Sequence, residues 1–261
     1  MFPTLATLGI STYGFDQRGW GRSVHSPSEK GLTGPTPLIL SDTTSFIKSV
    51  LASSSPDDDS KNTPLFLMGH SMGGAQVLCY ITLGPSDVVS KIRGFLCEAP
   101  FLSLHKETKP SITTMLVARF AGKIFPHRQM VFPLDEKLLS RDPQVQKDFV
   151  EDKLCHDTGT LEGLAGNLDR SNSLDTGKLL ISEGKGEGGK TRVWLSHGTE
   201  DGVCDYKSSE RLYDRMKDVK DKELKLYKGW YHKCKYLPFR NGAVHTVWIL
   251  TWSSTRRTEP R

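Results

Sequence analysis

The chain has 261 residues, which suits one large α/β domain, or one domain with an insertion, and is long enough to bury a substantial core. Its charged fraction of 25% and net charge of +5 are ordinary, and because no basic stripe interleaved with aromatics is present, we expect no nucleic-acid partner. No apolar run is long enough to span a membrane, and five widely spaced cysteines without a C-x-x-C pair exclude a disulfide framework and a zinc site.

The compartment is inferred from the cysteines and the N-terminal residues. An odd number of cysteines favours free thiols in a reducing environment. Residues 1–4 lack a basic stretch followed by an apolar one, so a secretory signal peptide is not expected. The sequence therefore predicts a cytoplasmic protein.

The first hundred residues alternate between strand-like and helix-like segments. Strands are expected at 10–15, 64–68 and 92–97 and helices at 35–50 and 75–80, with a glycine-bearing turn at 16–23 and an exposed loop at 53–62. Strands that alternate with helices imply a mostly parallel sheet.

A G-x-S-x-G motif, Gly69-His70-Ser71-Met72-Gly73, lies between the predicted strand at 64–68 and the predicted helix at 75–80. Strand, G-x-S-x-G and helix form the nucleophile elbow of serine hydrolases. The serine lies in a sharp, strained turn, and side chains at the two glycines would collide with the neighbouring strand or helix. This pattern predicts that Ser71 is a nucleophile and that the Met72 N–H faces an oxyanion at a helix N-terminus. The alternative interpretation of the motif is a tight turn with a purely structural role.

Residues 101–190 differ from the rest of the chain. Ile112, Leu116, Phe120 and Ile124 recur every four residues and predict one face of an amphipathic helix over 110–125. Polar, poorly periodic sequence follows, and the glycine run at 184–189 reads as a flexible connector because no strand leads into it. We therefore expect a single domain with a core at 1–100 and 191–233, a helical cap at about 101–190 and an atypical tail at 234–261.

Downstream of the cap, strands are expected at 191–195 and 224–227, with a helix at 208–216 between them. A serine nucleophile needs a histidine base and an orienting acid, and in this class of hydrolase they follow the serine in the order acid, then histidine. Asp201 follows the first of these strands and His232 follows the second. Asp205 is the rival acid and His245 the rival base. His197 and His70 are expected to pack or hydrogen-bond locally.

Four motifs together resemble a known family. They are Gly-His-Ser-Met-Gly-Gly at 69–74, Phe-Asp-Gln-Arg-Gly-x-Gly-x-Ser at 15–23, His-Gly-Thr-x-Asp at 197–201 and Gly-x-Tyr-His at 229–232, and they are similar to the fungal type of monoacylglycerol lipase. The resemblance covers most of residues 5–233. It implies an α/β-hydrolase fold and hydrolysis of monoacylglycerol to fatty acid and glycerol, with Ser71 as nucleophile, Asp201 as acid and His232 as base. It also implies a cap that forms a lid over an acyl channel and touches membranes or lipid droplets. We expect no cofactor and no metal.

The chain departs from the family pattern in two places. The family carries a His-Gly oxyanion motif after an earlier strand, but only about a dozen residues precede Phe15 here and none is a His-Gly. Loss of one oxyanion donor costs roughly 2.7–4 kcal/mol of transition-state stabilisation. The missing strand would lie between those at 10–15 and 64–68, so we expect a gap in the sheet with unpaired backbone groups on both sides. The tail from Cys234 to Arg261 is also unlike the family, which predicts a truncated or mis-spliced product with a poorly held His232 loop.

Two functional hypotheses follow. The first is a serine hydrolase of lipid esters, most simply a monoacylglycerol lipase, with a lysophospholipase, a carboxylesterase or an acyltransferase as alternatives that share the acyl-enzyme. The second is an incomplete, non-catalytic fragment of a hydrolase that at most binds acyl chains or a partner.

Overall fold

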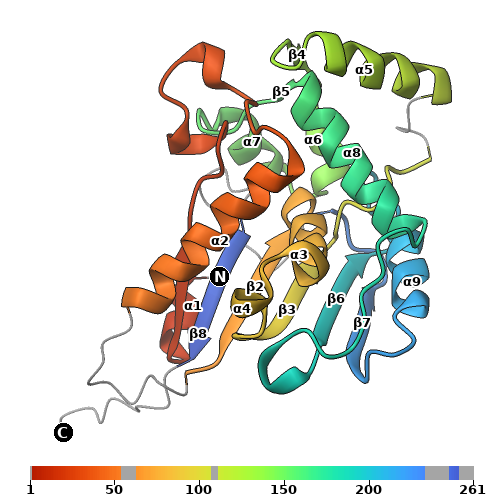
Figure 1. Ribbon diagram of the computed structural model, residues 1–261. Coiled ribbons are helices and arrows are strands. Elements are labelled where there is room, and N and C mark those ends of the chain that lie inside the picture. Colours follow the sequence, from red (N-terminus) through yellow and green to blue (C-terminus); the bar gives the residue numbers. More distant parts are fainter. Residues whose placement is uncertain (1, 54–62, 107–110, 233–246, 253–261) are drawn as a thin grey trace, which may run out of the picture.

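The computed structural model describes residues 2–53, 63–106, 111–232 and 247–252, and it is built around a six-stranded sheet (Figure 1). The strands follow the order β1 (Ile10–Gly14), β8 (Val247–Trp252), β2 (Leu65–His70), β3 (Ile92–Glu98), β6 (Arg192–Gly198) and β7 (Asp221–Tyr227). The pairs β2–β3, β3–β6 and β6–β7 are parallel, whereas β8 is antiparallel to both β1 and β2. All strands except β8 therefore run in one direction, as the alternation of strands and helices predicts.

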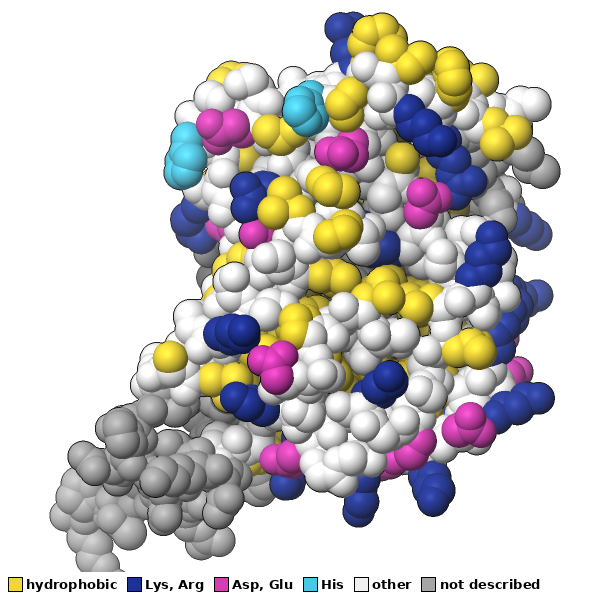
Figure 2. Space-filling model, in the orientation of Figure 1, with side chains coloured by type: hydrophobic (Ala, Val, Ile, Leu, Met, Phe, Trp, Pro, Cys, Tyr) yellow, Lys and Arg dark blue, Asp and Glu magenta, His cyan; other side chains and the backbone are white. Residues whose placement is uncertain are grey.

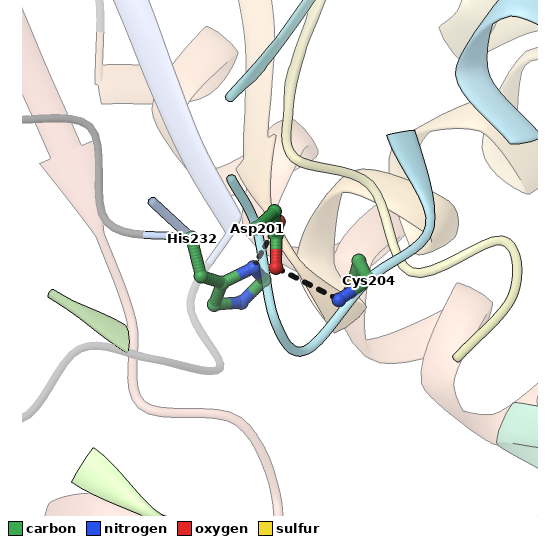
Figure 3. Close-up of side chains that lie close together, drawn as sticks. All are labelled: Asp201, Cys204 and His232. Atoms are coloured by element: carbon green, nitrogen blue, oxygen red, sulfur yellow. Dashed lines mark hydrogen bonds and ion pairs between the residues drawn. The ribbon is translucent and has the colours of Figure 1, made fainter. Parts of the chain in front are cut away.

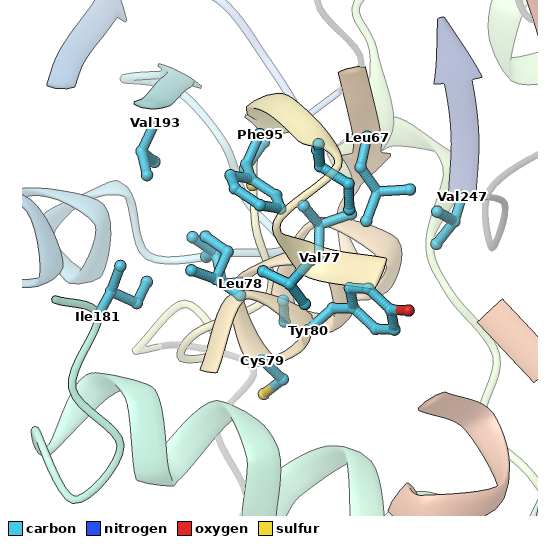
Figure 4. Packing of buried hydrophobic residues seen from close by; sticks show 14 of the residues in the cluster. Leu67, Val77, Leu78, Cys79, Tyr80, Phe95, Ile181, Val193 and Val247 are labelled. Atoms are coloured by element: carbon cyan, nitrogen blue, oxygen red, sulfur yellow. The ribbon is translucent and has the colours of Figure 1, made fainter. Parts of the chain in front are cut away.

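Helices cover one face of this sheet and enclose the main core. They are α2 (Thr36–Ser53), α3 (Met72–Leu83), α4 (Ser86–Val89), α8 (Leu161–Asp175) and α9 (Tyr206–Arg215). Figure 4 shows Leu67 and Phe95 of the sheet facing Val77, Leu78 and Tyr80 of α3. The short helix α1 (Phe2–Thr7) contributes Leu5 to a smaller cluster around Met68, Trp248 and Leu250.

The prediction of a gap in the sheet is wrong, because β8 lies between β1 and β2. Phe66 pairs with Leu250 on one side of β8, and Thr12 pairs with the same leucine on the other. Val247 and Ile249 lie in the main core cluster, while Trp248 and Leu250 lie in the smaller one. This strand is therefore buried on both faces, and it supplies the backbone partners that β1 and β2 would otherwise lack.

Sequence analysis missed β8 and most of the elements between β3 and β6. The missed elements are β4 (Gln129–Val131), α6 (Glu136–Leu139), α7 (Pro143–Glu151), β5 (Thr158–Thr160) and α8. Asp142 caps α7 through the Gln144 N–H and Thr160 caps α8 through the Gly163 N–H. A capping side chain followed by proline at the first helical position was a readable signal at α7.

The predicted amphipathic helix exists as α5 (Ile112–Ile124), but its apolar face is not packed against the core. Leu116, Phe120 and Ile124 are between 53% and 68% exposed. By contrast, Leu174 of α8 and the following Ile181 belong to the main core, so the later part of the segment assigned to the cap also builds the core. No helix among the described residues has the length and hydrophobicity needed to cross a bilayer.

Candidate active site

Ser71 lies in the turn that joins β2 to α3, and its backbone is strained. Its φ of 53° and ψ of −119° place a non-glycine residue in a region that L-amino acids rarely adopt. A Cβ added at Gly69 would lie 2.8 Å from the Gly74 nitrogen and collide with the backbone of Gly73, so only glycine fits there. The Ser71 N–H donates to the Glu98 carbonyl oxygen at 2.9 Å, which ties the turn to β3.

The three side chains predicted as nucleophile, base and acid form one hydrogen-bonded chain. His232 Nε2 lies 2.9 Å from Ser71 Oγ, and His232 Nδ1 lies 2.7 Å from Asp201 Oδ2. A carboxylate can only accept, so Nδ1 carries the hydrogen and Nε2 presents a lone pair to the serine hydroxyl. This is the tautomer that a general base for Ser71 requires.

Asp201 is held as an anion by its surroundings. Burial by itself raises the pKa of Asp201, but the electrostatic attraction of the neighbouring His232 and hydrogen bonds from His197 and His232 outweigh it and hold the pKa well below its usual range. Two backbone N–H groups, of Val203 and Cys204, also donate to Oδ1 at 2.8 Å each. The carboxylate therefore remains ionised at neutral pH and accepts four hydrogen bonds.

One group of side chains could in principle hold a metal ion, because one possible metal-ligand atom from each of Asp201, Cys204 and His232 lies within 4.8 Å of the others (Figure 3). The same figure shows Asp201 between the other two residues, with hydrogen bonds to the His232 ring and to the Cys204 backbone nitrogen. Both oxygens of Asp201 thus accept hydrogen bonds, so these three residues lie close together because they belong to the hydrogen-bonded chain. Burial raises the pKa of the Cys204 thiol well above its usual value, so that thiol is neutral.

The rival residues lie elsewhere or outside the described residues. Asp205 caps α9 through the Lys207 N–H and pairs with Arg211 at 3.4 Å, so it does not face His232. His245 lies outside the described residues. His70 packs beside His232, with its Nε2 donating to the His232 carbonyl oxygen at 3.1 Å. Met72 begins α3, so its N–H has no acceptor within the helix and is free by position to face an oxyanion.

The loop that carries His232 is held by the sheet and by the segment between β3 and β6. The Glu200 N–H donates to the Trp230 carbonyl at 2.8 Å, and a Cβ at Gly198 would lie 2.6 Å from the Trp230 carbonyl carbon. From the segment between β3 and β6, Arg141 donates to the Gly229 carbonyl oxygen at 2.5 Å and lies 5.0 Å from the centre of the Tyr231 ring. The expected poor support of this loop is therefore not observed among the described residues.

His197 hydrogen-bonds locally, as sequence analysis predicted, but its partner was not identified there: it donates to the same Asp201 oxygen as His232. The only signal was its place four residues before Asp201 in the His-Gly-Thr-x-Asp motif. That spacing across a turn does not reveal whether the ring points toward the acid or into the core.

Comparison with known proteins identifies the family. The chain matches the sequence family described as "Serine aminopeptidase, S33" over residues 1–235. The chain belongs to this family. A protein of Schizosaccharomyces pombe is 28% identical over 233 residues, which are 88% of this chain and 56% of that protein. The monoglyceride lipase of Saccharomyces cerevisiae is 29% identical over 230 residues, which are 87% of this chain and 70% of that enzyme. The chain thus spans a little over half the length of the first of these relatives.

Solved structures of family relatives show the same fold. A soluble variant of the Saccharomyces cerevisiae monoglyceride lipase, solved with a substrate analog, matches with a TM-score of 0.72 at 28% identity, over 84% of this chain and 68% of that one. The monoacylglycerol lipase of Paleococcus ferrophilus matches with a TM-score of 0.66 at 29% identity, over 84% and 74% of the two chains. With its mostly parallel sheet and flanking helices, this family member has the α/β-hydrolase fold.

Proposed function

We propose that this chain is a serine ester hydrolase that cleaves monoacylglycerol to a fatty acid and glycerol. The observation that carries the proposal is the continuous chain of hydrogen bonds from Ser71 Oγ through the His232 ring to Asp201 Oδ2, with distances of 2.9 and 2.7 Å. The substrate class is supported by the names of the relatives, two of which are a monoglyceride lipase and a monoacylglycerol lipase.

The geometry supports a two-step reaction through an acyl-enzyme. Ser71 Oγ attacks the ester carbonyl while His232 Nε2 takes the hydroxyl proton, and the Met72 N–H stabilises the resulting oxyanion. His232 then gives its proton to the departing glycerol oxygen as the ester C–O bond breaks. Water attacks the acyl-enzyme carbonyl while His232 takes its proton. The acyl C–O bond to Ser71 then breaks, His232 returns the proton to Ser71 Oγ, and the fatty acid is released. Asp201 stabilises the imidazolium in both steps.

Covalent labelling with a fluorophosphonate probe tests the nucleophile. The purified chain should be labelled once, Ser71→Ala should not be labelled, and the intact chain should hydrolyse a monoacylglycerol. The control Ser49→Ala removes an exposed hydroxyl on α2 and should keep the label. Labelling that survives in Ser71→Ala, or a folded chain that neither labels nor hydrolyses the ester, contradicts the proposal.

We further propose that the cap contacts a lipid surface. Figure 2 shows apolar side chains gathered, with lysine and arginine among them, at the end of the molecule where Figure 1 places α5 and β4. Large exposed hydrophobic residues in this region are Leu116, Val117, Phe120, Ile124, Phe125, Met130, Val131 and Phe132. Apolar side chains beside cations favour the interface of an anionic bilayer.

Vesicle sedimentation tests this contact. Phe120→Ser removes a side chain that is 68% exposed, and burying such a ring in lipid is worth about 1.5–3 kcal/mol, so binding to anionic phosphatidylserine-containing vesicles should weaken roughly tenfold or more. The matched control is Leu83→Ser, which changes a residue that is 50% exposed at the end of α3, outside the cap, and should bind as the unaltered chain does. Equal binding by all three contradicts a cap-mediated contact.

A further inference from the structure

A second histidine engages the Asp201 carboxylate. His197, the penultimate residue of β6, is fully buried, and its Nε2 lies 3.0 Å from Asp201 Oδ2. Its other ring nitrogen, Nδ1, lies 2.8 Å from Ser209 Oγ on α9, which is also fully buried. An unbroken chain of contacts therefore runs from Ser209 through His197, Asp201 and His232 to Ser71.

The direction of each hydrogen bond follows from the carboxylate. Because an ionised carboxylate only accepts, His197 must donate from Nε2, and the neutral ring then presents the Nδ1 lone pair to the Ser209 hydroxyl, which donates. Each oxygen of Asp201 thus accepts two donors, His197 and His232 on Oδ2 and two backbone N–H groups on Oδ1. Rotation of the carboxylate would break bonds at both oxygens.

We propose that His197, held by Ser209, is a positioning residue that keeps Asp201 Oδ2 aimed at His232 Nδ1. The inference rests on the proposed function, since it assigns a second support to the same catalytic histidine. Ser209, His197 and Asp201 resemble a second Ser-His-Asp triad, but none of the three side chains of that set is accessible enough for Ser209 to meet a substrate. The second imidazole therefore acts through the acid and not on the ester.

Three variants separate positioning from packing. His197→Phe fills a similar volume without a donor, His197→Gln restores an N–H donor, and Ser209→Ala leaves His197 in place without its second support. Loss of a hydrogen bond to a charged group corresponds to about 10- to 100-fold, so kcat of His197→Phe on a water-soluble p-nitrophenyl ester should fall by that factor. KM should stay within about twofold because His197 does not reach the substrate, and His197→Gln should recover part of kcat. The kcat of Ser209→Ala should fall less, by on the order of a few-fold.

The pH profile distinguishes this role from a structural one. A carboxylate that can rotate stabilises the His232 imidazolium less, so the midpoint of the rising limb of kcat/KM should move to lower pH in His197→Phe and, by a smaller step, in Ser209→Ala. Unchanged kcat with an unchanged midpoint overturns the inference. A midpoint that moves to higher pH also overturns it, because His197 would then only withdraw charge from Asp201. If His197→Phe fails to fold, the Gln and Ala variants give the same decision.

A measurement that needs no turnover separates this inference from the proposed function. In proton NMR of Ser71→Ala, two strongly deshielded imidazole N–H signals are expected, one from each histidine bonded to Asp201. His197→Phe in the same background should remove one signal and shift the other. A single signal that survives the substitution unshifted overturns the inference. Two signals in Ser71→Ala, together with an unaltered chain that folds but does not label with fluorophosphonate, overturn the proposed function alone.

Discussion

Replacing Ile249 with alanine tests whether β8 completes the sheet. Ile249 is fully buried in the main core and pairs with Tyr13 on one side and Leu67 on the other. The substitution removes three carbons, worth about 0.8 kcal/mol each on transfer, or roughly 2.4 kcal/mol. The cavity left behind places the total within the range of about 2–5 kcal/mol seen for such changes. Because the total stability of a domain is about 5–15 kcal/mol, a loss of this size should clearly lower its resistance to unfolding.

Urea unfolding followed by circular dichroism measures this loss. The midpoint for Ile249→Ala should fall while the slope stays unchanged, since the variant loses stability and not the surface exposed on unfolding. Leu83→Ala is the control, because Leu83 is 50% exposed at the end of α3 and its truncation should cost less than about 1 kcal/mol.

Fluorophosphonate reactivity extends the test to the elbow. β8 pairs with β2 as far as Val247 opposite Gly69, so loosening it should slow labelling of Ser71 under mild denaturant before the control is affected. If Ile249→Ala unfolds at the same urea concentration as Leu83→Ala and labels at the same rate, β8 does not lie between β1 and β2, and our account of the sheet fails.

Three further predictions concern the site and its thiols. Gly69→Ala should lower the rate of ester hydrolysis by roughly 100-fold or more. Its Cβ would force the backbone at Gly74 to shift, and a displacement of about 1 Å at a reacting group has an effect of that size. Activity close to that of the unaltered chain would contradict the elbow geometry. Because the pKa of Asp201 is lowered on folding, its ionised form stabilises the fold above its unfolded pKa of about 3.9, and this contribution is lost as the pH falls below that value. Urea unfolding of the unaltered chain and of Asp201→Asn, measured between pH 6 and 2 at steps of about one unit, tests this. The difference in stability between the two should shrink on acidification, and a constant difference would refute the reasoning. Burial raises the pKa of Cys79 to about 12, so iodoacetamide followed by mass spectrometry should modify the partly exposed Cys155 before Cys79, and the reverse order would show that α3 is not buried as described.

The parts of the structure that local sequence predicts are those in which neighbouring residues decide the outcome. The turn at Ser71 requires glycine at specific offsets, and Asp201 and His232 each follow a strand whose apolar pattern is readable, so their approach to one another was expected from the order of the motifs. Their catalytic roles remain a prediction that the labelling and rate measurements test.

The parts that were missed depend on contacts between distant segments. The run Val247 to Trp252 is rich in β-branched and aromatic residues and has strand character, but nothing local reveals that it inserts between β1 and β2. The apolar period of α5 likewise indicates a face without indicating whether that face meets the core or solvent. The Ser209–His197 contact joins a strand to a helix, so its two members carry no shared motif.

The insertion of β8 between two strands from the first seventy residues also sets an order of events during folding. β1 and β2 are not neighbours in the sheet, so neither can form its pairing with β8 until residues 247–252 have been synthesised and have returned across the molecule. At typical elongation rates of about 5–20 residues per second, that delay lasts on the order of ten seconds or more after β2 is made. During this interval the edge of β2 beside the elbow is an open template for other strands, and pairing over such a long stretch of chain is intrinsically slow. A chaperone that shields this edge during synthesis would therefore raise the yield of folded protein more than it would for a sheet closed by local hairpins.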